Sequence, residues 1–172
     1  MPEEGMPRSL RIGGCSKEEL RSQLEAAGVS LNPAAERLFE DDRWETASDV
    51  RRVKIRTISV AELGLAEGAT YQQCVALARE LGYSECPLEL AAALRLAYAD
   101  QPVAPERPAD AEPGSPPGAI TVASAPLDAS EETPRGFYLR NINGTLWLRG
   151  YWSDDEHVWA PGDLFVFMRN EG

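Results

Sequence analysis

Histidine is almost missing from this chain, since His157 is the only one among 172 residues. A single histidine excludes Cys₂His₂ zinc sites, metal-binding helices with two histidines, and catalysis by a histidine pair within one chain. Any Ser–His–Asp or Cys–His arrangement would have to use His157. The chain also lacks a Gly-x-Ser-x-Gly elbow, a Gly-x-x-x-x-Gly-Lys-Ser/Thr loop and a Gly-x-Gly-x-x-Gly fingerprint, which argues against the hydrolases and nucleotide-binding folds that use them. No cofactor is expected.

Cysteine is scarce as well. Cys15, Cys74 and Cys86 are widely spaced and form no Cys-x-x-Cys pair, which argues against a disulfide framework and against a zinc site. We expect free thiols in a reducing compartment. The N-terminal segment lacks the basic and apolar regions of a signal peptide, and no apolar run approaches the ~20 residues that span a membrane. These absences predict a soluble cytoplasmic protein with no membrane partner.

Positive charge is also in short supply. The formal net charge is −11 and the sequence pI is about 4.6, and Lys17 and Lys54 are the only lysines. An acidic surface repels phosphate backbones, so composition argues against a nucleic-acid partner unless a local basic patch exists.

Two helices are expected near the N-terminus. Ser16 and Glu19 form a capping-box pattern that begins the first, and Gly28 is placed to end it with a left-handed cap. Asn32 followed by Pro33 is a typical N-cap and first helical residue for the second. Residues 12–14 contain two glycines ahead of the first helix, which indicates a flexible lead-in more than an anion-binding cradle.

A strand and two further helices follow. Residues 50–60 alternate like a strand, but the alternation slips at Thr57–Ile58, where a bulge or the strand end is expected. Thr70 begins a capping box for a helix that ends at Gly82. The alanine-rich segment 87–98 favours a helix, although its last five residues also alternate as in a strand.

The C-terminal half reads differently. Residues 101–118 are rich in proline, alanine and acidic side chains, so they are predicted to form a flexible insert that cannot bury enough apolar surface to order itself. Beyond it, residues 119–124, a hairpin within 136–152, and residues 163–168 suggest an antiparallel meander of about four strands. The whole chain, residues 1–172, is therefore predicted to be one α+β domain in which N-terminal helices precede the sheet.

The hairpin is the most informative segment. Asn143–Gly144 favours a type I′ turn, because both central residues need positive φ. A two-residue turn fixes the register, and side chains alternate between the two faces of a strand. Phe137, Leu139, Leu146 and Leu148 then form one face, which reads as core. The opposite face carries Tyr138, Arg140, Trp147, Arg149 and Tyr151.

The mixed face suggests a function. Tyrosine, tryptophan and arginine dominate binding hot spots, so Tyr138, Arg140, Trp147 and Arg149 predict a non-catalytic binding or regulatory module for a protein partner or a small ligand. The alternative is that helices or the insert cover this face and Trp147 is core. A third hypothesis, a nucleic-acid accessory protein, depends on the same face and is opposed by the net charge.

His157 supports an enzyme hypothesis. It follows Asp154, Asp155 and Glu156, and carboxylates beside an imidazole can hold a divalent metal or tune a general base. Asp154, Glu156 and His157 are therefore the weaker candidates for a metal site or for a small hydrolase. Neighbouring loop residues seldom converge on one ion, so a solvated acidic turn is the preferred interpretation.

The chain also resembles a family of uncharacterised bacterial proteins, some of which carry a helicase label. The resemblance rests on segments at residues 12–20, 38–40, 67–70, 86–90, 94–98, 136–140 and 146–151. It implies a bacterial origin, one shared domain and no established activity. The missing phosphate-binding loop, the short length and the acidity do not fit a helicase.

Overall fold

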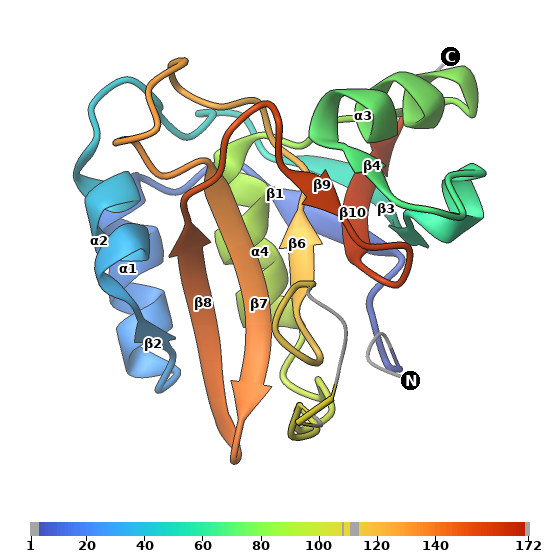
Figure 1. Cartoon of the computed structure of the whole chain (residues 1–172). Coiled ribbons are helices and arrows are strands. Elements are labelled where there is room, and N and C mark those ends of the chain that lie inside the picture. The colour runs from blue at the N-terminus through green and yellow to red at the C-terminus, as the bar shows by residue number, and fades with distance from the viewer. Residues whose placement is uncertain (1–3, 108, 111–113, 171–172) are drawn as a thin grey trace.

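The computed structural model describes residues 4–107, 109–110 and 114–170. It is an α+β structure, as predicted, but its helices alternate with strands along the chain instead of preceding them (Figure 1). The helices are α1 (Lys17–Ala26), α2 (Pro33–Glu40), α3 (Tyr71–Glu80) and α4 (Leu88–Ala97), with a 3₁₀ turn η1 (Ala61–Leu63). The strands are β1 (Ser9–Ile12), β2 (Ser30–Leu31), β3 (Arg51–Ser59), β4 (Ala69–Thr70), β5 (Tyr83–Ser84), β6 (Ile120–Val122), β7 (Gly136–Ile142), β8 (Thr145–Tyr151), β9 (Val158–Trp159) and β10 (Leu164–Arg169). No helix in these ranges combines the length and the apolar character needed to cross a membrane.

The main sheet is mixed, so the predicted antiparallel meander is wrong. Its eight strands follow the order β1-β3-β10-β6-β7-β8-β2, with β5 pairing beside β10, and the β10–β6 and β2–β8 pairs are parallel. The last strand thus enters the middle of the sheet. Phe165, Val166 and Phe167 are all fully buried, and consecutive buried residues require cover on both faces, which a central strand receives.

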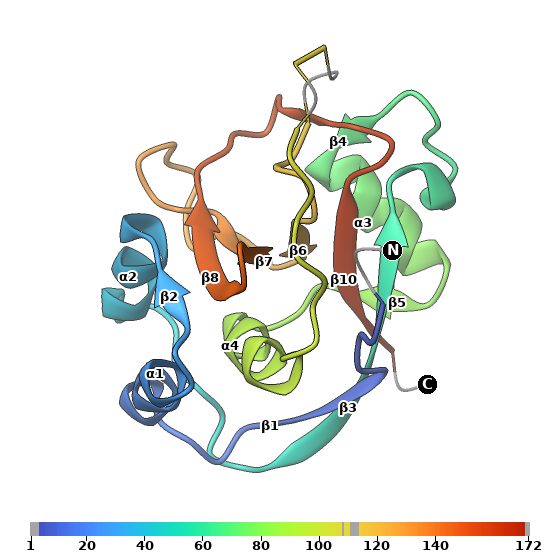
Figure 2. The same cartoon turned by 90° about the horizontal axis from the view of Figure 1, so that it is seen from below.

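Helix α4 fills the concave side of the sheet. The sheet curls around it as a half-barrel, and α1 and α2 close the side next to β8 (Figure 2). Leu90 and Leu94 are completely buried, and so is Tyr98 just after the helix. Spacing of four residues places these side chains on one helical face, which explains why the segment ends as helix although its alternation also fits a strand.

The slip at Thr57–Ile58 marks a change of buried face and not a bulge. Val53 and Ile55 pack in the core around α4, whereas Ile58 packs in a second core beneath α3. Pairing with β10 stays in register from Ile55 to Ser59. The strand therefore buries one face at its start and the other face at its end, which leaves the outer face of its first half uncovered.

The predicted N-caps of three helices are confirmed. The Ser16 hydroxyl accepts a hydrogen bond from the Glu19 backbone N–H, and Asn32 Oδ1 accepts from Ala35 N–H at 2.9 Å. Thr70 and Gln73 form the complete capping box. Each bond satisfies a backbone group that the first helical turn leaves unpaired.

The described part of the 101–118 insert has no helix or strand, while residues 108 and 111–113 lie outside the described residues. Its first residues are firmly held. Gln101 is buried, and its carbonyl accepts from Asn141 Nδ2 at 2.8 Å. Ala104 N–H donates to the Asn141 carbonyl at 2.8 Å. The insert therefore begins attached to the hairpin, because these polar groups would otherwise be buried without partners.

Candidate binding face

The hairpin has the predicted register and the predicted core face. Asn143 and Gly144 have φ of 54° and 91°, as the turn requires, and every cross-strand pair from Ile142–Thr145 to Tyr138–Arg149 matches the expectation. Phe137, Leu139 and Leu148 are fully buried, and Leu146 is half-buried near the turn. The opposite side chains therefore point away from the core.

The predicted binding residues lie together on the outer side of the hairpin; we call Tyr138, Arg140, Trp147 and Arg149 the front face. Arg149 Nε donates to Tyr138 Oη at 2.8 Å. The guanidinium of Arg149 also lies 4.7 Å from the centroid of the Trp147 ring, within the range of a cation–π contact. One arginine thus holds both aromatic rings of the front face in place.

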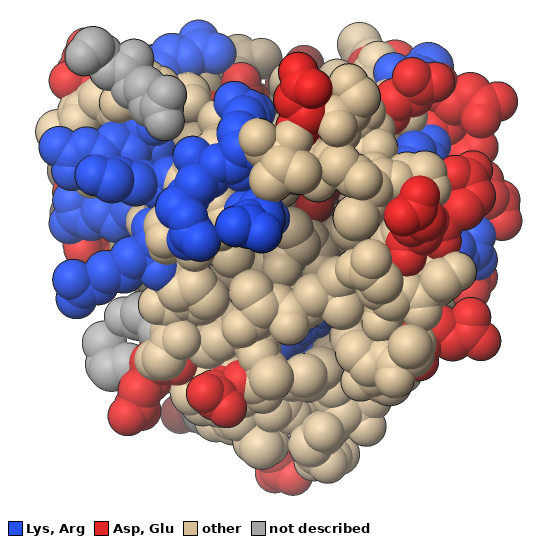
Figure 3. All heavy atoms as spheres, turned by 180° about the vertical axis from the view of Figure 1, so that it is seen from behind, with Lys and Arg blue, Asp and Glu red and all other residues tan. Residues whose placement is uncertain are grey.

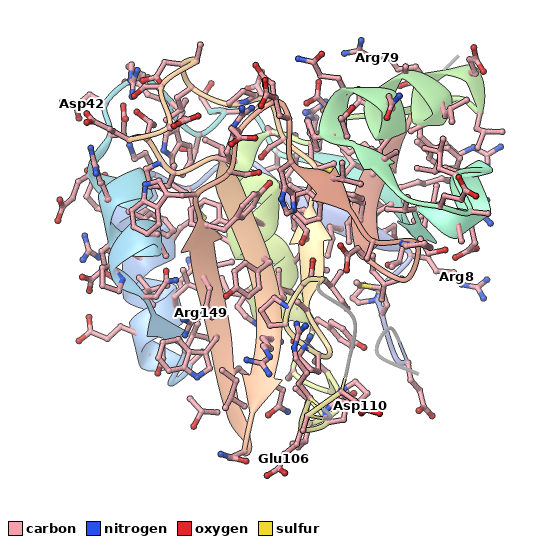
Figure 4. The ribbon with its side chains drawn as sticks, viewed as in Figure 1. Arg8, Asp42, Arg79, Glu106, Asp110 and Arg149 are labelled. Atoms are coloured by element: carbon pink, nitrogen blue, oxygen red, sulfur yellow. The ribbon has the colours of Figure 1, made fainter. Side chains whose placement is uncertain are left out.

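The front face is only partly accessible to solvent. All four front-face side chains are half-buried. The insert reaches one corner, where Arg140 Nε donates to the Pro117 carbonyl at 2.8 Å. Beside Trp147, strand β2 pairs with β8, and Ser30 aligns with Trp147. Figure 4 shows Arg149 on the front of β8. The front face is therefore partly framed by neighbouring segments, and Trp147 is neither fully buried nor fully open.

A small pocket continues the front face; we call it the front pocket and define it by Thr121, Tyr138, Tyr151, His157 and Trp159. Its volume is about 140 Å³, and residues 114–116 of the insert form one wall. Tyr151 and Trp159 meet edge to face at 5.7 Å, and His157 meets Trp159 edge to face at 5.1 Å. Burial raises the pKa of the Tyr151 hydroxyl, so this hydroxyl stays protonated and can donate a hydrogen bond.

Sequence analysis missed Thr121 and Trp159, which reach this pocket from β6 and β9. The antiparallel pairing of β6 with β7 brings Thr121 next to Tyr138, while β10 flanks β6 on its other side. Trp159 is buried against Phe165 with ring centroids 4.8 Å apart. Neither position is signalled by local pattern, because both depend on how distant strands pair.

The carboxylates of the acidic turn are bonded to separate partners. Asp154 Oδ1 accepts the Glu156 backbone N–H at 2.9 Å, and Asp155 forms an ion pair with Arg135 at 2.8 Å. Glu156 and His157 are exposed. Within the described ranges, no group of three His, Cys, Asp or Glu side chains is placed to hold a metal ion. The structure thus does not bring Asp154, Glu156 and His157 together.

Three further carboxylates, Glu62, Glu85 and Glu89, accept hydrogen bonds within the fold. Glu62 Oε1 accepts the Ser59 backbone N–H at 3.1 Å, Glu85 accepts the Tyr71 hydroxyl at 2.7 Å, and Glu89 accepts the Ala47 N–H at 3.1 Å. Each of these carboxylates therefore accepts a hydrogen bond within the fold, from a different segment of the chain.

Comparison of the chain with protein-family models, with curated proteins and with solved structures finds no match. The resemblance to uncharacterised bacterial proteins therefore stays an expectation.

Proposed function

We propose that this protein is a non-catalytic binding module whose front face docks a partner protein. The observation that carries the proposal is the pre-arranged set of Tyr138, Trp147 and Arg149, which stay half-exposed while their own contacts fix their positions. Side chains that are ordered before binding lose less conformational entropy on docking, which favours affinity.

The size of the front pocket supports a protein partner over a small ligand. Sites for drug-sized molecules have volumes of roughly 300–1,000 Å³, whereas the front pocket holds about 140 Å³. A space of this size accommodates a single side chain of a partner. Arg149 donates a hydrogen bond to Tyr138, which lines this pocket, and Arg140 lies on the same face of the hairpin. The partner surface is therefore expected to present carboxylates or carbonyl oxygens.

The alternative of a small hydrolase using His157 receives no comparable support. The His157 ring lies edge-on against Trp159, and its carboxylate neighbours Asp154 and Asp155 are bonded elsewhere. A general base needs a partner that orients it and a reacting group within hydrogen-bond reach, and no such arrangement surrounds His157 in the described residues.

The test begins with capture of partners from a lysate of the organism that encodes the chain, using wild type and Trp147→Ala in parallel. A true partner should be retained by wild type and by Arg79→Ala, whose residue is exposed on α3, and lost from Trp147→Ala. Its measured Kd should rise at least about 30-fold in Trp147→Ala, because a hot-spot residue contributes about 2 kcal/mol.

Thermal unfolding of Trp147→Ala and of the milder Trp147→Phe shows whether lost binding reflects lost folding. Equal affinity of wild type and a folded Trp147→Ala for every captured protein would remove the front face from the proposal.

A further inference from the structure

Cations are concentrated on the back of the molecule. Figure 3 shows Lys and Arg grouped over one region of this surface, while Asp and Glu dominate the side nearer α1. Strands β1, β3 and β10 form this region. Sequence alternation already places Arg52, Lys54 and Arg56 on one side of β3, and this is the side that the change of buried face leaves uncovered.

Four of these cations line a groove of about 890 Å³; we call Arg8, Lys54, Arg56 and Arg169 the basic groove. They come from the segment before β1, from β3 and from the end of β10. Each is exposed. Among the residues that the structure describes, none of the four forms an ion pair with a carboxylate, and no acidic residue lines the groove.

The neighbouring contacts hold the groove in shape. Arg56 Nη1 donates to Tyr83 Oη at 3.3 Å, and this bond raises the pKa of the guanidinium. Tyr83 itself pairs with Arg169 across β5 and β10. Arg52 Nη1 donates to Ser9 Oγ at 3.0 Å. The long side chains are thus partly ordered by neutral hydroxyl groups, which leave their positive charge uncompensated.

The crowding of positive charges around β3 is unfavourable for the isolated protein. Arg11 and Arg52 are direct partners in the β1–β3 ladder, and like charges directly opposite each other destabilise a strand pair. In a chain of net charge −11, this local concentration runs against the composition. Sites where local rules are broken without a structural gain are where function is expected.

We propose that the basic groove binds the phosphate backbone of a double-stranded nucleic acid without reading its sequence. Alternate residues of β3 lie about 7 Å apart, so Lys54 and Arg56 of the groove, with the adjacent Arg52, form a row of charge about 14 Å long. A duplex offers one phosphate charge per about 1.7 Å of its axis. Such a polyanion matches a row of cations better than the scattered carboxylates of a protein surface.

Two features select the duplex backbone over single strands and membranes. Tyr83 is the aromatic residue of the groove and is only 8% exposed, so it offers no open ring on which unpaired bases stack, as single-strand binding uses. The cations line a hollow, which a flat bilayer surface would not enter. The net negative charge does not prevent binding, because charges beyond the Debye length of about 8 Å at physiological salt are largely screened.

This inference goes beyond the proposed function, since the basic groove shares no residue with the front face, and either can fail alone. The experiment measures fluorescence anisotropy of a labelled 20-base-pair duplex over a salt series. If four phosphates are contacted, wild-type affinity should fall about 100-fold between 50 and 200 mM salt. Lys54→Gln/Arg169→Gln removes two exposed cations and should reduce that fall to about tenfold.

The matched control is Arg21→Gln/Arg37→Gln, which removes two cations from α1 and α2 and changes net charge equally. It should bind the duplex as wild type does. The proposal is overturned if the control weakens binding as much as the groove variant, if wild type fails to bind the duplex at 50 mM salt, or if poly-glutamate of equal charge competes as well as unlabelled duplex. Tighter binding of the corresponding single strand would also overturn it.

Discussion

Arg149 and Tyr138 face each other across the C-terminal hairpin and share a hydrogen bond of 2.8 Å from Nε to Oη. The same guanidinium lies over the Trp147 ring. Arg149 therefore links three side chains of the front face, and this link should be measurable as a coupling energy.

A double-mutant cycle of Tyr138→Phe and Arg149→Ala tests the link. Removing the Tyr138 hydroxyl should destabilise wild type by about 1 kcal/mol, since an intramolecular hydrogen bond contributes about 0.5–1.5 kcal/mol. In the Arg149→Ala background the same change should have almost no effect, which gives a coupling energy of similar size. Chemical denaturation supplies the free energies of unfolding. Additive effects would mean that the bond is not formed in solution.

Leu148 and Arg149 are neighbours in sequence but should differ strongly in their contribution to stability. Leu148 is fully buried whereas Arg149 is half-exposed. Leu148→Ala should lower the free energy of unfolding by about 2–5 kcal/mol through lost apolar contact and a residual cavity. Arg149→Ala should lower it by about 1 kcal/mol. Urea titrations of both variants decide this, and equal losses would contradict the assignment of the two hairpin faces.

Gly13 should resist substitution for a reason that sequence alone does not reveal. Its φ is +88°, and a Cβ there would lie 2.0 Å from the Asp49 carbonyl oxygen. The neighbouring Gly14 N–H donates to the Ala47 carbonyl at 2.9 Å. The two glycines thus allow the lead-in to pack against residues 47–49, and the Gly14 N–H is unavailable to an anion.

Gly13→Ala is therefore expected to cost at least about 3 kcal/mol, which combines strain at positive φ with a backbone clash. Gly144→Ala is the matched control, because its φ is +91° and nothing lies within 4 Å of an added Cβ. It should cost only about 1 kcal/mol. Similar midpoints for the two variants in thermal unfolding would show that the packing against Asp49 is not maintained.

The free thiols should differ in reactivity. Cys74 and Cys86 are buried, whereas Cys15 is half-exposed. Burial raises the pKa of the Cys74 thiol to about 11 and also raises the pKa of Cys86, so both remain protonated at neutral pH, and the thiolate is the reactive form. A thiol-specific chromogenic reagent should modify one cysteine in the native protein and three after denaturation. Cys15→Ser should eliminate the native reaction.

Features set by residues close together in the sequence could be predicted, whereas features set by contacts between distant segments could not. Asn143–Gly144 determined the hairpin register and its two faces because a two-residue turn leaves no freedom in pairing. Ser16, Asn32 and Thr70 marked helix starts for the same local reason. The central position of β10 could not be foreseen, since β3 precedes it in the chain by about a hundred residues and no turn links the two strands.

The buried polar groups show the same limit. Arg95 is 1% exposed and donates to Gln101 Oε1 at 2.6 Å and to the Trp147 carbonyl at 3.2 Å. Desolvation lowers its pKa to about 10. In the sequence, Arg95 reads as a polar residue on an alanine-rich helix. Its role as a buried hydrogen-bond donor depends on the hairpin and the start of the insert, which pack against the helix and supply its acceptors.

The basic groove had one visible signal in the sequence: Lys54 and Arg56, together with the neighbouring Arg52, alternate with Val53 and Ile55. That pattern is also what a solvated strand face looks like. The distinction required Arg8 and Arg169, which lie at opposite ends of the chain and line the same groove because β1 and β10 flank β3. Composition could not supply this, because a net charge says nothing about where charges gather.

Proteolysis of the insert tests whether its middle is accessible while its start is anchored. Figure 4 shows Glu106 and Asp110 in the lower part of the view, and both are exposed. A glutamate-specific protease should cut after Glu106. Trypsin is the matched control: Arg107 is the only basic residue of the insert and is followed by proline, so trypsin should leave this segment intact.

The two fragments should stay associated after the cut at Glu106. Residues before the cut supply β1, β3 and α4, and residues after it supply β6 to β10, so the halves share one sheet and one core. The bonds from Asn141 to Gln101 and Ala104 also hold the new end in place. Native size-exclusion chromatography should show the nicked protein at its original volume, while a denaturing gel shows two bands. Separation of the fragments under native conditions, or resistance of Glu106 to the protease, would contradict this account of the insert.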